Sequence, residues 1–334
     1  GMLSVIVPIY NAEKFLARCL DSLLEQGVED YEVVCVNDGS TDGSGEILQQ
    51  YHKRHPDVIK VLEQENRGLP AARNEGMRLA KGDVLAFCDA DDYLVPGAYR
   101  YLLENFWTEE TELLRFDSVT LDRKMLKTWK EKEELEGSML FDGEACNFLK
   151  RGERSLYFVW SYLYRQSFLM EHGIVFRMLK QCEDTAFNLD VYMCNPHMRY
   201  VNANVYRYTT SEGQVTRCRE AFYLRDAVES YVLLFERMEE YARQFPARAK
   251  ELKRYVEWEM LPFFSRVLSV KYSKTEMLSL KEVLRGMGVL PMRSRSMAAR
   301  VVNAVMNNYV SYFVASALYR NLFIPYVLPR LSRN

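Results

Sequence analysis

The sequence lacks several features that would place it in a common protein class. Its 334 residues contain no run of about 18 apolar residues, so no membrane-spanning helix is predicted. The seven cysteines are scattered without a CxxC pair, which excludes the usual zinc and dithiol motifs and is typical of reduced cysteines in a cytosolic protein. The formal net charge of −2 argues against a nucleic-acid partner.

Two glycine motifs for nucleotide binding are also missing. A dinucleotide-binding fold needs GxGxxG directly after a strand, whereas Gly39, Gly43 and Gly45 have a different spacing. The phosphate-binding loop GxxxxGK followed by Ser or Thr does not occur. The sequence therefore indicates neither a dehydrogenase nor a P-loop enzyme.

Acidic residues are absent from the C-terminal part of the chain. From Val283 to Asn334 there is no Asp, Glu or Lys, while Arg occurs at positions 285, 293, 295, 300, 320, 330 and 333. This predicts a basic, apolar tail over residues 291–334. The tail either lies on an anionic membrane surface, folds back on the core or forms a contact in a homodimer.

Apolar runs alternate with helical patterns over the first hundred residues. The runs LSVIVPIY, YEVVCVND, VIKVLEQ and DVLAF are rich in β-branched residues, and Asn11 is expected to cap the first intervening helix. This alternation predicts an α/β fold with a mostly parallel sheet and flanking helices. Residues 106–140 are expected to form two strands as a hairpin, residues 142–150 a short helix, and residues after about 220 a helical region.

Polar residues follow each of the four apolar runs, at positions 8–11, 37–42, 66–68 and 89–92. Because ligands of parallel α/β sheets bind beyond the carboxyl ends of the strands, we expect these clusters to form one site.

The cluster after the fourth run contains three carboxylates. Asp89, Asp91 and Asp92 would repel each other, which indicates a cation among them. The alternative is a turn with solvated Asp side chains.

These motifs resemble a known family. The stretches VIVPIYN, VVCVNDGSTDGS and NRGLPAARNEGMRLAKGDVLAFCDADDYL, in this order, resemble the nucleotide-sugar-binding half of a family 2 glycosyltransferase with the A-type, Rossmann-like fold. A sparser match follows in VWSYLYRQSFL and CEDTAFN. The resemblance implies a catalytic domain at 2–215, with a nucleotide-binding half (2–105) and an acceptor half (106–215), and then a helical region at 216–334.

The resemblance also implies a nucleoside-diphosphate sugar, with UDP favoured as the nucleotide, and a divalent Mn²⁺ or Mg²⁺ ion. Asp91 would bind the metal, and Asp89 would contact the metal and the ribose hydroxyls. Asp92 would support the metal through water or cap the next turn. The other expected donor-side residues are Pro8, Tyr10, Asn11, Asp38, Asn66 and Arg73.

Some donor-side residues have more specific expected roles. Pro8 and Tyr10 would line the pocket for the base. Asp38 would accept the N3–H of uracil or form an Asx-turn into Gly39. Arg73 would hold the base or a phosphate, pair with a carboxylate of the acidic cluster, or lie on the surface of its helix.

The acceptor half must supply a base. By resemblance, Asp184 removes the proton from the acceptor hydroxyl, with Glu183 beside it; the alternative is a pair of acidic residues that only start a helix. Trp160, Tyr162 and Tyr164 lie where the family builds its acceptor side, although an aromatic stripe is also typical of a core.

One departure concerns the late loop YRYTTSEGQVTRCRE, which lacks the His that many metal-dependent members of the fold place there. Arg207 or Arg217 would face the diphosphate instead. We expect an inverting glycosyltransferase that acts on a glycan or lipid-linked glycan in the cytoplasm, peripherally on the inner face of the membrane. A non-catalytic nucleotide-sugar-binding protein and a haloacid-dehalogenase-type phosphatase are the alternatives.

Overall fold

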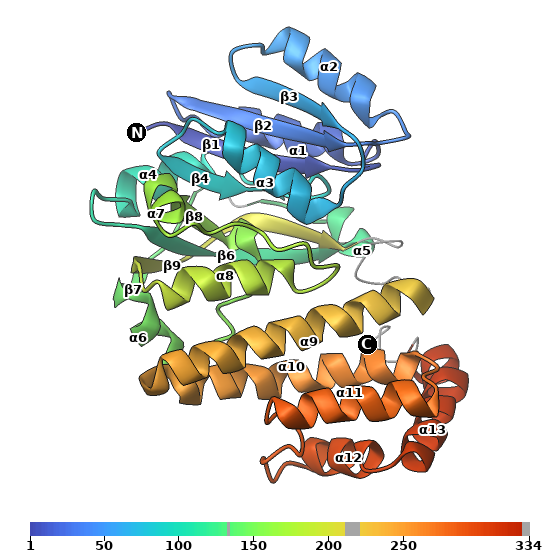
Figure 1. Cartoon of the computed structure of the whole chain (residues 1–334). Coiled ribbons are helices and arrows are strands. Elements are labelled where there is room, and N and C mark those ends of the chain that lie inside the picture. Colours follow the sequence, from blue (N-terminus) through green and yellow to red (C-terminus); the bar gives the residue numbers. More distant parts are fainter. Residues whose placement is uncertain (132–133, 211–220, 329–334) are drawn as a thin grey trace. The chain divides into compact units, whose positions relative to one another are not determined.

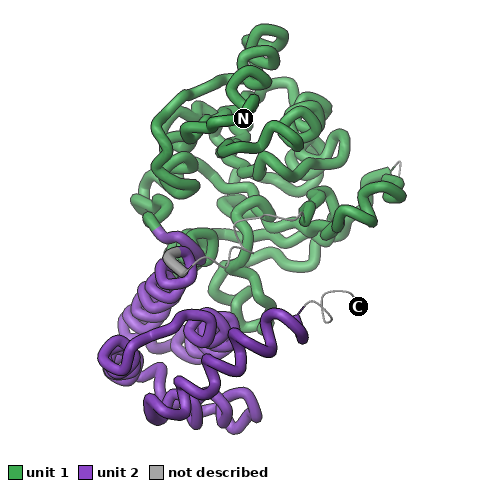
Figure 2. Tube along the Cα trace, turned by 90° about the vertical axis from the view of Figure 1, so that its right-hand side faces the viewer, with its two compact units in different colours: residues 1–178, 183–214 green, residues 179–182, 215–334 purple. Residues whose placement is uncertain are grey.

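The computed structural model describes residues 1–131, 134–210 and 221–328. Contacts between residues divide the chain into two compact units (Figure 2). Unit 1 comprises residues 1–178 and 183–214, and unit 2 comprises residues 179–182 and 215–334.

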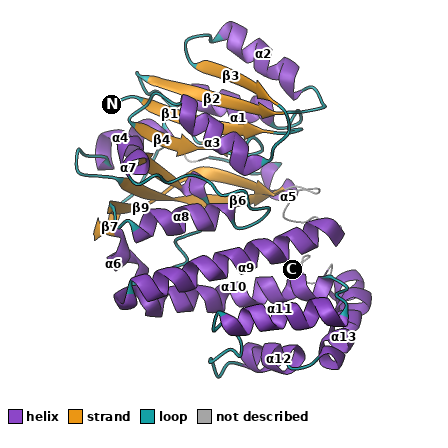
Figure 3. Ribbon diagram, in the orientation of Figure 1, coloured by secondary structure: helices purple, strands orange, loops and turns teal. Residues whose placement is uncertain are grey.

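Unit 1 begins with the predicted alternation of strands and helices (Figure 1). Its strands are β1 (Leu3–Ile9), β2 (Tyr31–Asp38), β3 (Ile59–Gln64) and β4 (Val84–Phe87), and its helices are α1 (Leu16–Leu24), α2 (Ser44–Arg54) and α3 (Leu69–Leu79). The strands are parallel in the order β3-β2-β1-β4, and α1 and α3 cover opposite faces (Figure 3). The reversal of strand order at β1 explains this, because right-handed crossovers in opposite directions place their helices on opposite faces.

The register of β1 brings the polar ends of the strands to one rim. Ile9 of β1 pairs with Asn37 of β2, and Ile6 pairs with Phe87 of β4. The residues after β1, β2 and β4 therefore leave the sheet at the same edge, as the sequence predicted. Every residue of β1 is buried, so this edge rests on a rigid central strand.

Helix α3 approaches β1 closely because it carries a glycine at the contact. A Cβ on Gly76 would collide with the Ile6 side chain. This close approach sets the position of the N-terminal turns of α3, where Arg73 lies.

The sheet continues with strands from the second half of unit 1. In the described part of the chain it has nine strands: β5 (Tyr93–Leu94), β6 (Leu113–Asp122), β7 (Met139–Glu144), β8 (Tyr162–Arg165) and β9 (His197–Thr210) complete it. β8 pairs antiparallel with both β4 and β6, β9 runs parallel to β6, and β5 and β7 pair antiparallel with β9. This half of the sheet is mixed, whereas the first half is parallel.

The predicted hairpin over residues 106–140 is wrong. β6 forms as expected, but the chain then enters the short helix α5 (Arg123–Leu126), which Asp122 caps through the Met125 amide at 2.7 Å. The partners of β6 are β8 and β9, which are distant in the sequence. The short helix predicted at residues 142–150 is found as α6 (Ala145–Leu149), and the remaining helices of unit 1 are α4 (Ala98–Phe106), α7 (Gln166–Glu171) and α8 (Glu183–Met193).

Unit 2 is helical, as predicted. Its helices are α9 (Ala221–Gln244), α10 (Ala249–Ser269), α11 (Lys274–Gly286), α12 (Met297–Met306) and α13 (Tyr309–Leu318), followed by the π-helical segment η4 (Tyr319–Val327). Helices α9 and α10 pack together through aromatic residues, with the Phe235 and Phe263 ring centroids 5.3 Å apart. Among the described residues, none of the helices is both long and apolar enough to cross a membrane.

Candidate active site

The loop after β1 is tied to the loop after β2. Asn11 accepts a hydrogen bond from the Thr41 amide at 2.8 Å, and its own amide donates to Ser40 Oγ at 3.0 Å. The expectation that Asn11 caps a helix is wrong, because α1 starts only at Leu16 and Asn11 adopts φ +49°. The preceding Pro8 is buried within β1, and Tyr10 remains exposed at the rim.

The carboxylate of Asp38 holds the entry to α3. It accepts hydrogen bonds from Gln64 Nε2 at 2.9 Å, from the Arg67 amide at 2.8 Å and from the Gly68 amide at 2.9 Å. In the loop after β2, the side chain that accepts a nearby backbone amide is Asn37 and not Asp38: Asn37 Oδ1 accepts a hydrogen bond from the Ser40 amide at 3.3 Å.

Asn66 lies in the loop between β3 and α3, where its side chain is exposed. Its backbone passes close to Gly39, which has φ +73°, and a Cβ on Gly39 would lie 2.7 Å from the Asn66 nitrogen. A glycine is therefore required where the two loops meet.

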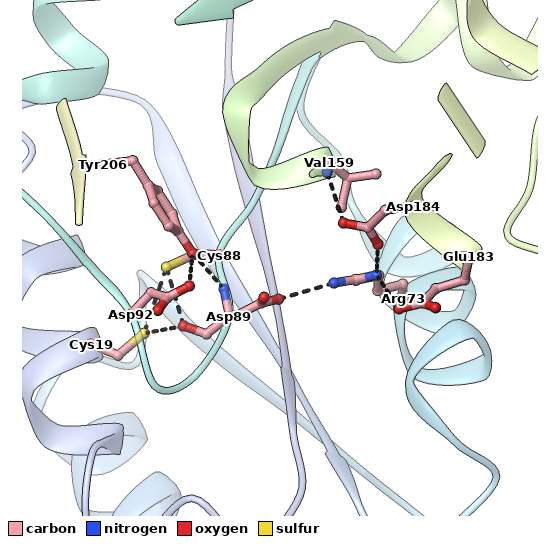
Figure 4. A network of polar contacts seen from close by, with 9 residues as sticks. All are labelled: Cys19, Arg73, Cys88, Asp89, Asp92, Val159, Glu183, Asp184 and Tyr206. Carbon is pink, nitrogen blue, oxygen red and sulfur yellow. Dashed lines mark hydrogen bonds and ion pairs between the residues drawn. The ribbon is translucent and has the colours of Figure 1, made fainter. Parts of the chain in front are cut away.

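Arg73 is the centre of the site (Figure 4). Its guanidinium is almost completely buried; Nη2 donates to Asp89 Oδ1 at 3.0 Å and Nη1 donates to Asp184 Oδ1. Glu183 Oε1 lies 3.7 Å from Nη1. Of the expected alternatives for Arg73, the structure shows the pairing with a carboxylate of the acidic cluster.

This arrangement joins residues from both halves of unit 1. Asp89 follows β4, whereas Glu183 and Asp184 begin α8. Asp184 lies 111 residues beyond Arg73 in the sequence. Asp184 Oδ2 also accepts the Val159 amide at 2.9 Å. Both carboxylate oxygens of Asp184 are thus bound by groups outside α8.

The charges of this network perturb each other. Burial raises the pKa of Asp89 to about 6; Arg73 opposes the rise, and Asp91 and Asp184 add to it. Burial and Asp184 likewise raise the pKa of Glu183 to about 7, against the effect of Arg73. Burial acts to lower the pKa of Arg73, but Asp184, Asp89 and Glu183 outweigh it and keep the guanidinium charged.

Asp92 has a different environment from Asp89. It is fully buried, accepts the hydroxyl of Tyr206 at 2.6 Å and accepts the amide of Thr209 at 2.9 Å. The Tyr206 hydroxyl also accepts the Asp89 amide at 3.1 Å, so it bridges the two ends of the acidic loop (Figure 4). Asp92 therefore anchors the acidic loop to β9.

The backbone of Asp91 is held from two sides. Its carbonyl accepts Arg18 Nη2 at 2.9 Å and Thr209 Oγ1 at 2.6 Å. The sequence analysis missed Arg18, Tyr206 and Thr209, because no local pattern connects them with the acidic loop.

Carboxylate oxygens of Asp89, Asp91 and Asp92 lie within 4.8 Å of one another. Hard oxygen ligands in this number suit Mg²⁺ or Mn²⁺. Because Asp92 directs both oxygens at β9, Asp91 and Asp89 are the residues that fit a metal ion.

The aromatic residues expected on the acceptor side are mostly in the core. Tyr162 and Tyr164 are buried, with their hydroxyls bound to Tyr192 at 2.8 Å and to Asn188 at 2.6 Å. The buried Trp160 stacks on Tyr206 at a centroid distance of 4.2 Å.

An exposed aromatic ring lies beside Trp160. Phe158 stacks on it at 4.7 Å, is 43% exposed and has φ +60°. The sequence analysis missed Phe158, although it adjoins the aromatic stripe.

Arg207 pairs with Glu131 in a bidentate ion pair, with nitrogen–oxygen distances of 2.8 and 2.6 Å. It also stacks on Trp129, with its guanidinium carbon 5.7 Å from the ring centroid. Arg217, the alternative expected to face a diphosphate, lies outside the described residues.

The sequence is similar to known glycosyltransferases. Residues 4–169 match the family described as Glycosyl transferase family 2. The chain is 33% identical to EpsJ of Bacillus subtilis, over 64% of this chain and 63% of that protein. It is 31% identical to EpsH of the same organism, over 70% of this chain and 67% of that protein. Both relatives are described as glycosyltransferases, and the chain spans about two thirds of their length.

The fold is similar to that of solved glycosyltransferases. The structure of S. aureus TarS 1-349 in complex with UDP-GlcNAc matches with a TM-score of 0.68 at 22% identity, over 96% of this chain and 92% of that chain. The mannosyltransferase PcManGT from Pyrobaculum calidifontis, in complex with GDP-Man and Mn²⁺, matches with a TM-score of 0.55 at 16% identity, over 96% of this chain and 87% of that chain. The chain belongs to glycosyl transferase family 2 and has the A-type glycosyltransferase fold.

Proposed function

We propose that this glycosyltransferase moves a sugar from a nucleoside-diphosphate sugar, with UDP as the nucleotide, to a hydroxyl of a glycan or lipid-linked glycan. The transfer is a single displacement that inverts the anomeric carbon. The observation that carries the proposal is the buried Arg73, which binds Asp89 of the donor half and Asp184 of the acceptor half with one guanidinium. A single rigid cation thereby fixes the distance between the two carboxylates.

Asp184 is the base in this proposal. Arg73 and the Val159 amide hold its carboxylate in one orientation, and each oxygen retains a lone pair for an acceptor hydroxyl. Glu183 lies beside it, and its pKa of about 7 leaves it partly protonated at neutral pH, so it can donate a hydrogen bond that orients the acceptor.

The donor site lies on the rim formed by the loops after β1, β2 and β3. Tyr10 offers an exposed ring for the base, and Asp38 is fixed by three hydrogen bonds where it can accept the N3–H of uracil. Asn11 and Asn66 border the same rim. TarS has been solved with UDP and with UDP-GlcNAc, which supports UDP as the nucleotide.

Asp91 and Asp89 would hold a divalent ion, which neutralises the diphosphate when it is bound. The Mn²⁺ in the PcManGT complex supports this assignment. The loop that holds these carboxylates is already fixed by Asp92, Tyr206 and Arg18. The positions of Asp89 and Asp91 are therefore set by the chain before an ion binds.

We assign the catalytic domain to residues 2–215 and a helical region to residues 216–334. We place the enzyme on the cytoplasmic side of the membrane, where nucleotide sugars are consumed. No role in binding nucleic acid is proposed.

The donor can be identified by thermal shift. Purified protein with Mn²⁺ is tested with UDP-glucose, UDP-galactose, UDP-GlcNAc and GDP-mannose, since a ligand of the folded state raises the Tm. We expect UDP-sugars to raise the Tm and GDP-mannose to have no effect. The reverse result would overturn the choice of nucleotide.

The base is tested with Asp184→Asn. This variant should lose sugar transfer to a glycan acceptor, by about a hundredfold or more, and keep its affinity for UDP. Transfer at the wild-type rate would exclude Asp184 as the base. UDP binding without transfer by the wild type, with every donor and acceptor class, would favour a non-catalytic nucleotide-sugar-binding protein. Hydrolysis of a simple phosphate monoester would favour the phosphatase alternative.

A further inference from the structure

Helix α13 exposes its apolar side and packs through its polar side. Its inward side chains are hydroxyl-bearing: Tyr312 donates to the Val270 carbonyl at 2.5 Å and Ser316 donates to the Leu268 carbonyl at 2.8 Å. On the opposite side, Val310 is 70% exposed and Phe313, Val314 and Leu318 are about half exposed. A helix on the surface of a globular protein normally has the reverse arrangement.

The exposed apolar side chains continue beyond α13. Leu322 and Tyr326 of η4 follow Leu318 at intervals of four residues, the spacing that keeps helical side chains on one side. On α12, which packs against α13, Met297 is 72% exposed and Val301 is about half exposed. We call these residues the C-terminal apolar face: Met297, Val301, Val310, Phe313, Val314, Leu318, Leu322 and Tyr326.

The chain segment that carries this face has charged side chains of one sign. Arg285, Arg293, Arg295 and Arg300 are exposed, and no Asp or Glu occurs in the sequence after Glu282. Arg300 follows Met297 by three residues and precedes Val301, so helical spacing places it on the same side of α12. The apolar face therefore has cationic neighbours without nearby acidic side chains from its own segment.

We propose that the C-terminal apolar face binds the surface of an anionic lipid bilayer, with the apolar side chains in the interface and the Arg side chains on lipid phosphates. A partner with negative charge and apolar depth matches both properties of the face. A second copy of this chain matches less well, because self-contact would bring two sets of Arg together without carboxylates from the same segment. The inference is independent of the proposed donor and base, since it involves only unit 2.

Vesicle flotation with the full chain tests the binding. The protein should float with vesicles of phosphatidylcholine and phosphatidylglycerol, and at least tenfold less with phosphatidylcholine alone. Raised salt should weaken the binding, because the Arg contribution is screened. Equal absence of binding to both vesicle types would overturn the proposal.

Paired substitutions locate the surface. Val314→Glu should lower vesicle binding about tenfold or more, whereas Leu233→Glu should not, although Leu233 on α9 is also 51% exposed and gains the same charge. Equal losses in both variants would show that charge alone is responsible and would contradict the face. A protein that is dimeric by light scattering, and monomeric after Val314→Glu, would instead assign the face to a second copy.

A fluorescence measurement avoids dependence on destabilising charges. Phe313→Trp should be quenched by brominated phosphatidylglycerol vesicles, whereas Leu233→Trp should not be quenched above the background of the native tryptophans. Quenching of both or of neither would contradict burial of the C-terminal apolar face in the interface.

Discussion

Asp89 and Asp92 are three residues apart in one loop, yet their surroundings differ in kind. Asp89 lies partly exposed against the Arg73 guanidinium, in a network that also contains Glu183 and Asp184. Asp92 lies fully buried against a phenol hydroxyl and a backbone amide of β9. A carboxylate that neighbours a cation and solvent can take part in binding, whereas a buried carboxylate with two fixed donors holds the backbone in place.

The comparison separates two contributions within a short acidic motif. The Arg73 network balances charge between the two halves of unit 1, and its members have shifted pKa values, as is common at functional sites. The Asp92 anchor fixes the loop through Tyr206, whose hydroxyl binds both Asp92 and the Asp89 amide. Substitutions on the two sides should therefore have different consequences.

The largest effect is expected for Arg73→Ala. Removal of a buried cation leaves Asp89, Glu183 and Asp184 without their shared partner, which should lower the free energy of unfolding by about 3–5 kcal/mol at pH 7. Urea unfolding measures this change. Sugar transfer should fall by about a hundredfold or more, because the carboxylates lose their fixed positions.

Two further variants sharpen this result. Arg73→Lys keeps the charge but not the planar fork, so it should recover part of the stability and little of the transfer. Arg78→Ala removes an exposed Arg that pairs with Glu75 on the same helix, and it should change stability by about 0.5 kcal/mol or less. An Arg73→Ala variant as stable as Arg78→Ala would refute the role of Arg73 in balancing charge.

The next largest effect is expected for Asp92→Ala. The Tyr206 hydroxyl and the Thr209 amide would lose a buried acceptor, which should cost about 2–4 kcal/mol. Tyr206→Phe should cost about 1–3 kcal/mol, since the Asp89 amide and Asp92 each lose a partner. Isothermal titration with Mn²⁺ then distinguishes an anchor from a ligand: Asp92→Asn and Tyr206→Phe should weaken Mn²⁺ binding by similar factors. A far greater loss in Asp92→Asn would identify Asp92 as a metal ligand.

A smaller, pH-dependent effect is expected for Glu183→Gln. Burial and Asp184 raise the pKa of Glu183 from 4.5 to about 7, so ionisation of this group disfavours the folded state. Glu183 therefore stabilises the folded state while it is protonated. This contribution to the free energy of unfolding is greatest below about pH 4.5 and is lost as the pH rises through 7. Because Gln cannot ionise, the free energy of unfolding of the variant should exceed that of the wild type by about 1–3 kcal/mol at pH 8 and by little at pH 5.

Urea unfolding at the two pH values checks this prediction. Glu104→Gln, at an exposed position on α4, serves as the control. Its free energy of unfolding should differ from that of the wild type by the same small amount at pH 5 and at pH 8. A Glu183→Gln variant that is less stable than the wild type at pH 8 would show that the ion pair with Arg73 outweighs burial.

The sequence predicted the parallel half of the sheet and the rim of the site for a physical reason. Each apolar run there forms a strand, a helix connects each strand to the next in the chain, and the polar ends of the strands leave the sheet on one side. Short-range patterns are sufficient for such a unit. The sequence also placed Asp89 and Asp91 in one cluster, because they are two residues apart in the chain.

The remaining features depend on contacts between distant residues. Arg73 and Asp184 are separated by 111 residues, and Asp92 and Tyr206 by 114. β6 pairs with β8 and β9 and not with the segment that follows it, which is why the expected hairpin is absent. No local periodicity distinguishes Asp89 from Asp92. The family resemblance gave them different expected roles, but the attachment of Asp92 to β9 could not be predicted before the fold was known.

The smallest effect on stability is expected for Asp91→Asn. Asp91 raises the pKa of both Asp89 and Asp92, after the effect of burial, which shows that the three carboxylates repel each other. Without metal, removal of its charge should relieve this repulsion and raise the free energy of unfolding by up to about 1 kcal/mol. With Mn²⁺ and UDP the order should reverse, because the wild type is stabilised by the ion and the variant is not. Thermal melts of both proteins, with and without Mn²⁺ and UDP, measure the two differences. Equal stabilisation of both proteins by Mn²⁺ and UDP would show that Asp91 does not bind the metal. The division of the acidic loop into a metal-binding part at Asp89 and an anchoring part at Asp92 would then lose its support.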